Sequence, residues 1–222
     1  EQHELLGVRY VQRARELGRP DLVILPGTKN TMEDLLWLRQ NGLEAAALKL
    51  AHAGTPILGV CGGYQMLGQT LDDPQGTESG RPMALSGLGL LPTRTVFDAQ
   101  KRRMQVRAAA QGELFGGARL TGYEIHNGRT EVGGAPFCVL EDGTPEGCVN
   151  RNVFGTYLHG LFDSGELTGA LVRMLCARKG ISPTQTKLMS MADYRQQQFD
   201  LLADGVRQAL DMGAVYRAIN TA

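Results

Sequence analysis

The chain has 222 residues, of which 42% are hydrophobic and 21% charged, and its 23 basic side chains balance 23 acidic ones. This length and composition are ordinary for a globular protein of one domain, or of one domain with an appendage. A neutral chain without a basic run gives no electrostatic reason to expect nucleic acid or an anionic membrane as a partner. Its apolar stretches fall short of the roughly 20 residues that a membrane span needs.

The first part of the chain predicts alternating strands and helices. The continuous apolar run at 21–25 ends at Pro26-Gly27 and suits a strand that is buried on both faces. Helical patterns follow at 31–41 and 43–53, and a second apolar strand occupies 56–60 before the pattern becomes helical again. Because strand, helix and strand alternate, we expect a parallel α/β sheet with helical crossovers.

The middle of the chain has a different pattern. Residues 72–82 are rich in Gly, Pro, Asp and Ser and predict a loop. Shorter strands broken by glycine-rich turns are expected after it, then one clear strand that ends at His159, and then a helix. The expected ranges are 93–97, 104–109, 122–125, 137–140 and 153–158 for the strands and 167–178 for the helix.

Two units are predicted along the chain. Residues 1–182 form the α/β domain, and residues 183–222 form a helical extension. In the extension Phe199, Leu202, Val206 and Leu210 are three and four residues apart, as on an amphipathic helix. We therefore expect the extension to pack on the α/β domain through this apolar face.

Three of the predicted strands end at residues that could take part in catalysis. The first ends at Pro26-Gly27, the second at Cys61, and the third at His159. If the three strands are parallel, their carboxyl ends share one edge of the sheet, where the ligand crevice of such folds lies. A thiol, an imidazole and a glycine loop would then meet although they are far apart in the sequence.

The setting of Cys61 distinguishes it from an ordinary buried cysteine. Gly62 and Gly63 follow it at the start of a predicted helix, so a sharp turn can present the thiol at a helix N-terminus, which favours the thiolate. A histidine within reach would take its proton. Amides of Gly62 and of the Gly27 loop could stabilise a tetrahedral oxyanion. Without the two glycines a core-filling role would be the better interpretation.

The remaining cysteines and histidines lack a comparable setting. Cys138, Cys148 and Cys176 are expected to fill the core, and no C-x-x-C pair or zinc-ligand spacing occurs. Four dispersed cysteines do not make a disulfide scaffold. We therefore expect no metal site and a reducing, cytoplasmic setting.

Four stretches of the sequence carry a resemblance to a known family. The segment GVCGGYQ at 59–65, within the stretch PILGVCGGYQMLG at 56–68, matches the nucleophile motif G-x-C-x-G-x-Q of class I glutamine amidotransferases. Together with DLVILPGTKNT at 21–31, GYEIHNGRT at 122–130 and TYLHGLFD at 156–163, it resembles the cobalamin-pathway branch of that class, and within it the cobyric acid synthase family. The last two motifs, in this order, point to the cobyric acid branch.

The resemblance implies a fold and a set of residue roles. The fold is a flavodoxin-like three-layer α/β sandwich with a mostly parallel central sheet. Cys61 would attack the side-chain amide of glutamine, and His159 would act as base and then as acid toward ammonia. Gly27 and Gly62 would supply the oxyanion amides, and Gln65 would hold the substrate.

The resemblance also implies partners outside these residues. In that family an ATP-dependent synthetase domain precedes the glutaminase domain, and no P-loop motif occurs here. We expect ATP and Mg to be used by that missing synthetase domain, with no cofactor in the glutaminase domain itself. The ammonia would amidate carboxylates of a corrinoid, adenosylcobyrinic acid a,c-diamide.

One departure from the wider class leaves a question open. Typical class I members carry His-x-Glu, whereas Gly160-Leu161 follow His159 here. The group that orients the imidazole could be absent, a backbone carbonyl, or an acid such as Asp163 or Glu124. Glu124 and His126 share one strand face and could line the site mouth, line a domain interface, or form a structural pair.

Three other functions remain open from the sequence. The ammonia could serve cobyrinic acid a,c-diamide synthesis or the amidation of lipid II, which are glutaminase systems with other acceptors. The chain could also be a non-catalytic α/β module for assembly, since the acid after His159 is missing. Retention of Cys61, Gln65 and His159 together argues against that last alternative.

Overall fold

The computed structural model describes residues 5–112, 115, 117–182 and 191–220 of the chain. Its central sheet has four strands in the order β1-β2-β10-β9. The first three are parallel and β9 is antiparallel to β10, which confirms the predicted parallel α/β arrangement. The strands are β1 (Val23–Leu25), β2 (Ile57–Val60), β9 (Cys148–Asn150) and β10 (Val153–Thr156).

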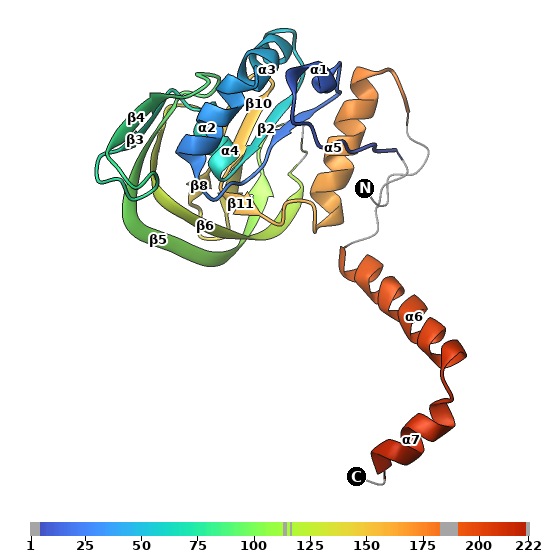
Figure 1. Cartoon of the computed structure of the whole chain (residues 1–222). Helices are drawn as coiled ribbons and strands as arrows, with labels where there is room; N and C mark the ends of the chain where they lie inside the picture. The colour runs from blue at the N-terminus through green and yellow to red at the C-terminus, as the bar shows by residue number, and fades with distance from the viewer. Residues whose placement is uncertain (1–4, 113–114, 116, 183–190, 221–222) are drawn as a thin grey trace.

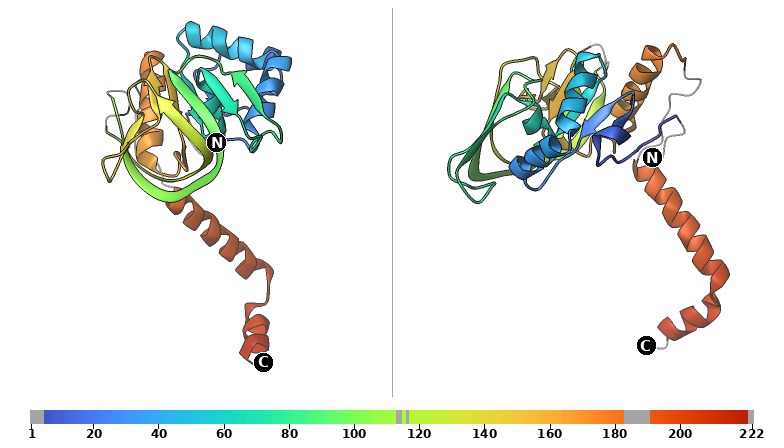
Figure 2. Two further views of the ribbon diagram at one scale, coloured as in Figure 1. Left: turned by 90° about the vertical axis from the view of Figure 1, so that its left-hand side faces the viewer. Right: turned by 45° about the horizontal axis from the view of Figure 1, so that its top comes forward.

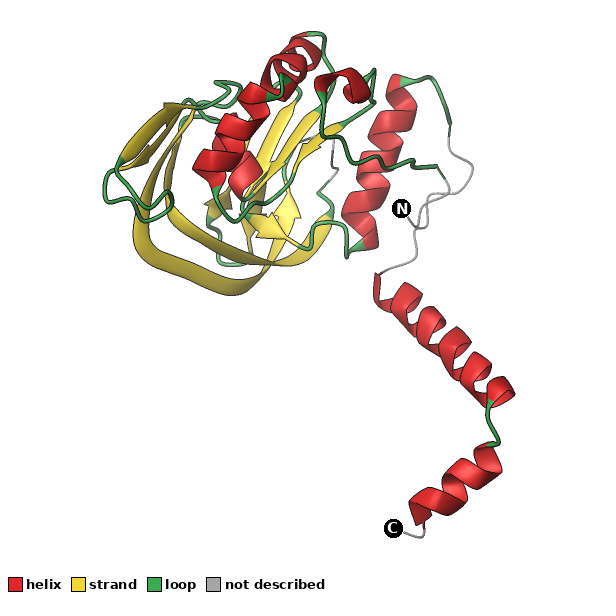
Figure 3. Ribbon diagram, in the orientation of Figure 1, coloured by secondary structure: helices red, strands yellow, loops and turns green. Residues whose placement is uncertain are grey.

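Helices lie on both sides of this sheet and make three layers (Figures 1 and 3). The helices α2 and α3 lie together on one side, and α5 lies on the other. Asn30 caps α2, because its side chain accepts a hydrogen bond from the backbone N–H of Glu33. The helices of this body are α1 (Ala14–Leu17), α2 (Thr31–Gln40), α3 (Leu43–His52), α4 (Gly62–Leu67) and α5 (Gly165–Arg178).

Side chains from the two faces of the central sheet pack in two separate hydrophobic clusters. Ile57 belongs to the cluster that contains Met32 and Leu35 of α2. The next residue, Leu58, belongs to the cluster that contains Leu167 of α5. Successive side chains of a strand point to opposite faces, so a strand covered on both sides must be apolar at every position. This explains the uninterrupted apolar runs in the sequence.

A second sheet curves beside the first, with the strand order β11-β6-β5-β3-β4 and with β7 pairing both β5 and β8. The expected strands at 93–97 and 104–109 are parts of one long strand, β5, and the expected strand at 122–125 is part of β6, whereas the one at 137–140 is the short strand β7. Glycines do not end β6. A Cβ on Gly122 would collide with the carbonyl of His159, and Gly128 has a positive φ of 85° inside β6. The strands are β3 (Thr70–Asp73), β4 (Met83–Ser86), β5 (Thr93–Ala110), β6 (Arg119–Val132), β7 (Cys138–Leu140), β8 (Pro145–Glu146) and β11 (Leu158–His159).

The expected strand at 153–158 is divided between the two sheets. Its first part is β10 of the central sheet, while β11 pairs antiparallel with β6. In that pairing Leu158 lies opposite Glu124 and His159 lies opposite Tyr123. The histidine is therefore held by the second sheet and not by the sheet that carries Cys61.

The C-terminal helices differ from the expectation. The helices α6 (Met191–Ala209) and α7 (Met212–Asn220) extend away from the α/β body, and neither has a buried residue (Figure 2). Phe199 and Leu202 of the predicted apolar face are more than 60% exposed. The packing of the extension on the domain is thus not observed, because an amphipathic pattern specifies a face and not what covers it. None of the described helices is long and apolar enough to cross a membrane.

The loop that follows β3 is anchored by one buried carboxylate. Asp73 is fully buried and accepts hydrogen bonds from the backbone N–H groups of Thr77 (2.7 Å), Glu78 (2.9 Å) and Ser79 (2.8 Å). The hydroxyl of Ser79 donates a fourth bond at 2.9 Å. Burial raises the pKa of Asp73, but these hydrogen bonds outweigh it and hold the pKa below its ordinary value.

Asp73→Ala is expected to destabilise the fold by about 2–3 kcal/mol at neutral pH, because three amides lose their acceptor. Urea unfolding measures the change, with Asp72→Ala at the exposed neighbouring position as the control. Because the folded-state pKa is lowered, the carboxylate stabilises the fold above its ordinary pKa, and the effect is lost as the pH falls through the folded value. A difference between the variants that stays constant into strong acid would contradict this account.

Candidate active site

The nucleophile candidate lies on a strained turn between β2 and α4. Cys61 has a φ of 52°, a region that residues with a side chain seldom adopt. The turn is tight because its glycines touch backbone. A Cβ on Gly63 would collide with the carbonyl of Leu25, and a Cβ on Gly59 would lie 2.7 Å from the carbonyl of Gly63. The two glycines thus allow the turn that presents the thiol.

Cys61 and His159 meet at the loop that follows β1. A Cβ placed on Gly27 would lie 3.0 Å from Cε1 of His159 and 3.5 Å from Cβ of Cys61. The ends of β1 and β2 and the short strand β11 therefore border one space. The thiol and the imidazole meet there although His159 belongs to the second sheet and not to a parallel strand of the central one. The Gly27 and Gly62 amides belong to the two segments that enclose the thiol, and their oxyanion role stays a prediction.

The Cys61 thiol is protonated in this state. The pKa of this thiol is raised to about 11, chiefly by burial. The backbone N–H of Gly62 acts to lower the pKa, and the charges of Glu78 and Glu124 act to raise it. Its Sγ donates a hydrogen bond to the carbonyl of Ile125 at 3.4 Å. A thiol of this kind needs a base at the moment of reaction.

His159 has the properties of such a base. Burial lowers the pKa of its imidazole, the charge of His126 lowers it further, and the carbonyl of Ile125 acts in the opposite direction. The ring stacks on Tyr123, with centroids 5.0 Å apart and planes within 8°. Its Nε2 is buried and has no hydrogen-bond partner among the described residues. The neutral ring can therefore accept a proton.

Neither acid considered for orienting the imidazole forms a hydrogen bond with His159 among the described residues. Asp163 is exposed, and its backbone N–H bonds to the carbonyl of Gly160. Glu124 is bound to Nε2 of His126 at 2.7 Å and to Arg102 at 3.1 Å. The groups at the ring are instead the Ile125 carbonyl and the face of Tyr123.

Glu124 and His126 form the structural pair that was one of the three alternatives. Glu124 is 3% exposed, and the ring of His126 stacks on Tyr157 at 3.6 Å between centroids. The Nδ1 of His126 is buried without a partner among the described residues. Through the stacking of His126 on Tyr157, the pair packs β6 against the residues that directly precede His159.

The side chain of Gln65 is engaged at both ends by the protein. Its Oε1 accepts from the hydroxyl of Thr31 at 3.0 Å. Its Nε2 donates to the carbonyl of Asn127 and to the hydroxyl of Tyr157, both at 3.2 Å. Gln65 is 3% exposed, so it links α4, α2 and β6 beneath the site. Direct contact of Gln65 with a substrate stays a prediction.

Glu146 is a functional candidate that sequence reasoning missed. Its buried carboxylate accepts from the backbone N–H of Tyr157 and the hydroxyl of Thr156, both at 2.6 Å, and from Cys138 at 3.3 Å. Burial raises its pKa. These bonds fix the connection between β10 and β11, directly before His159. No local pattern marks Glu146, because its partners lie about ten residues away.

The other three cysteines fill the core as expected. Cys138 and Cys148 have no exposed surface, and Cys176 lies on the buried side of α5. All four cysteines are free thiols.

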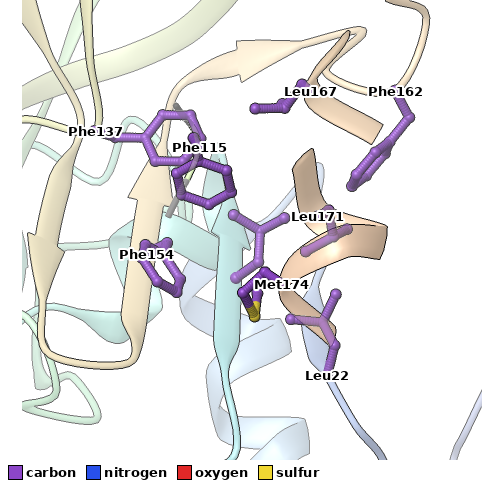
Figure 4. Close-up of a pocket in the computed structure, with 9 residues that line it drawn as sticks. Leu22, Phe115, Phe137, Phe154, Phe162, Leu167, Leu171 and Met174 are labelled. Carbon is purple, nitrogen blue, oxygen red and sulfur yellow. The ribbon is translucent and has the colours of Figure 1, made fainter. Parts of the chain in front are cut away.

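A separate apolar pocket lies between the central sheet and α5 (Figure 4). It contains no polar side chain and none of the candidate site residues, so it belongs to the packing of α5 and not to the chemistry. It is lined by Leu22, Leu58, Phe115, Phe137, Phe154, Phe162, Leu167, Leu171 and Met174.

Two solved structures share the fold. A crystal structure of a glutamine amidotransferase aligns with a TM-score of 0.55 at 18% identity, over 79% of this chain and 88% of that one. The structure of PurLQS from Thermotoga maritima aligns with a TM-score of 0.51 at 16% identity, over 71% and 80%. At this identity they establish the α/β fold alone.

Comparison of sequences places the chain in a family. The CobB/CobQ-like glutamine amidotransferase domain matches residues 1–167. The cobyric acid synthase of Streptococcus sanguinis is 43% identical over 97% of this chain, and that of Salmonella arizonae is 46% identical over 94%. The chain spans 44% and 43% of their lengths. It belongs to the family of CobB/CobQ-like glutamine amidotransferase domains.

Proposed function

We propose that this chain is a glutaminase domain that releases ammonia from glutamine through Cys61. The observation that carries the proposal is the convergence of the strained Cys61 turn, His159 and Gly27 on one space. The thiol transfers its proton to His159 as sulfur attacks the amide carbon, and His159 returns the proton to the departing ammonia. Water then hydrolyses the thioester to glutamate. The amides of Gly62 and Gly27 stabilise the oxyanion.

The acceptor of that ammonia is a corrinoid in this proposal. The support is the similarity to curated cobyric acid synthases at 43% and 46% identity. Those relatives are more than twice as long as this chain, which leaves room for an N-terminal synthetase domain in the same polypeptide. That domain would use ATP and Mg to amidate carboxylates of adenosylcobyrinic acid a,c-diamide. The four free thiols support a cytoplasmic location.

Steady-state assays of the complete polypeptide test the proposal. The chain, joined to the N-terminal part that its relatives carry, is expected to amidate adenosylcobyrinic acid a,c-diamide with glutamine and ATP. Cobyrinic acid and lipid II are tested as alternative acceptors. Amidation of one of these, without amidation of adenosylcobyrinic acid a,c-diamide, would overturn the proposed acceptor. Absence of any glutamine hydrolysis in the complete polypeptide would favour the non-catalytic assembly module.

A further inference from the structure

The loop that follows β3, which Asp73 anchors, places the side chain of Glu78 near the turn that holds Cys61. Asp73 holds the backbone of Glu78, and the side chain of Glu78 accepts a hydrogen bond from the backbone N–H of Thr31 at 2.6 Å. Thr31 belongs to the rim of the site, because a Cβ on Gly62 would lie 3.0 Å from its hydroxyl. The carboxylate of Glu78 is thus fixed beside the segment that holds Cys61.

This carboxylate has no cation to balance it. Among the described residues no basic side chain forms an ion pair with Glu78, and its second oxygen has no hydrogen-bond partner. Lys29, two residues before Thr31, is exposed. Glu78 also acts against catalysis when the site is empty, because its charge adds to the burial that raises the pKa of Cys61. A cation beside Glu78 would remove this effect.

The proposed substrate carries such a cation. In glutamine three carbon atoms separate the amide carbon, which must reach Sγ of Cys61, from the α-ammonium group. The hydroxyl of Thr28 also borders the nucleophile turn: a Cβ on Gly62 would be 2.7 Å from it, and it is buried without a partner among the described residues. A second polar group is therefore available at the same place.

We propose that Glu78 binds the α-ammonium group of the substrate glutamine and so determines the specificity of the glutaminase site for an α-amino acid. The assignment rests on the proposed glutaminase function. Substrate binding then neutralises Glu78, which makes proton transfer from Cys61 to His159 easier when the site is occupied. Selective reaction with glutamine over simple amides follows from the same contact.

Covalent labelling of the whole chain tests this contact. The probes are the diazoketone analogue of glutamine and the same diazoketone without its α-amino group. In each case the protonated diazoketone carbon is attacked by the Cys61 sulfur, N₂ leaves and a thioether forms, which intact mass measures over time. In the wild type, loss of the amino group is expected to slow labelling roughly 10- to 100-fold, as for a charge-assisted hydrogen bond.

The decisive comparison is Glu78→Gln. This variant is expected to label roughly 10- to 100-fold more slowly with the amino-bearing probe, and at least as fast as the wild type with the probe that lacks the group. Equal slowing with both probes, or no slowing with either, would overturn the assignment. Glu33→Gln, at an exposed acid in the first turn of α2, is the matched control and is expected to leave both rates unchanged.

A reagent without an ammonium group shows whether Glu78→Gln loses only the contact with that group or lowers the reactivity of Cys61 in general. Iodoacetamide carries no ammonium group, and removing the charge of Glu78 lowers the pKa of Cys61. Glu78→Gln is therefore expected to react with iodoacetamide at least as fast as the wild type. Slower reaction would mean that Glu78 only supports the turn. Failure of the wild type to label Cys61 with the amino-bearing probe would instead count against the glutaminase function itself.

Discussion

Cys61→Ser is expected to lower the rate of glutamine-dependent amidation in the complete polypeptide by more than roughly 10⁴-fold. With added ammonia the variant is expected to keep the wild-type rate. The serine hydroxyl has nearly the same volume but is a far weaker nucleophile, and the thiol already needs help because its pKa is about 11. Ammonia enters the reaction after the step that Cys61 performs, so it bypasses the substitution. The measurement is product formation with each nitrogen donor.

The control for this prediction is Cys176→Ser on α5. Cys176 is buried and remote from the candidate site, so this substitution is expected to keep the glutamine-dependent rate. If Cys61→Ser kept that rate as well, the nucleophile assignment would be wrong. If it lost the ammonia-dependent rate, the residue would act on the fold or the acceptor and not on glutamine.

His159→Ala is expected to lower kcat/KM for glutamine hydrolysis by about 10²–10⁴-fold. The imidazole lies beside Cys61 at the Gly27 loop, and its Nε2 has no partner among the described residues. It is thus the group that can accept the thiol proton and return it to ammonia. Kinetics with glutamine, over a concentration range that separates kcat from KM, measure the loss.

Two further measurements sharpen the test of His159. His52→Ala, at an exposed position of α3, is expected to leave the rate unchanged. The acid limb of the kcat/KM profile is expected below the ordinary histidine pKa of about 6.5, because burial lowers the pKa of His159. An unchanged rate in His159→Ala, or an acid limb above that value, would remove His159 from the mechanism.

The site replaces the acid of the His-x-Glu pattern with neutral groups. The Ile125 carbonyl lies at both Cys61 and His159, and Tyr123 stacks on the imidazole. A carbonyl orients the ring without adding a negative charge beside a thiol that must ionise. Two carboxylates already act on Cys61, so a third would raise its pKa further.

Much of the fold could be predicted from the sequence, because its signals are local. Apolar runs that end at Pro26-Gly27 and at Cys61 predict strands covered on both faces, and both are parallel strands of the central sheet. The caps and apolar spacing also predict α2 and α3 closely. The full lengths of β5 and β6 were missed. In β6, Gly122 and Gly128 resemble turn residues but serve close backbone contacts, whereas β5 contains no glycine and continues through a shift of register between Val96 and Lys101.

The C-terminal extension shows the limit of periodicity. Its spacing correctly predicts a helix with an apolar face, yet that face is exposed in the structure. Periodicity reports which residues share a face of a helix. The surface that covers the face depends on contacts that no local pattern encodes.

The sequence by itself determined the parallel core and pointed to Cys61 and His159 as candidate residues, because a strand end, two glycines and a histidine after an apolar run are local features. Only the tertiary structure decided what surrounds them. The Ile125 carbonyl, the Glu146 brace and the Glu78 carboxylate reach the site from β6, β8 and the loop after β3. Their roles depend on contacts between distant segments, which form only when the two sheets meet.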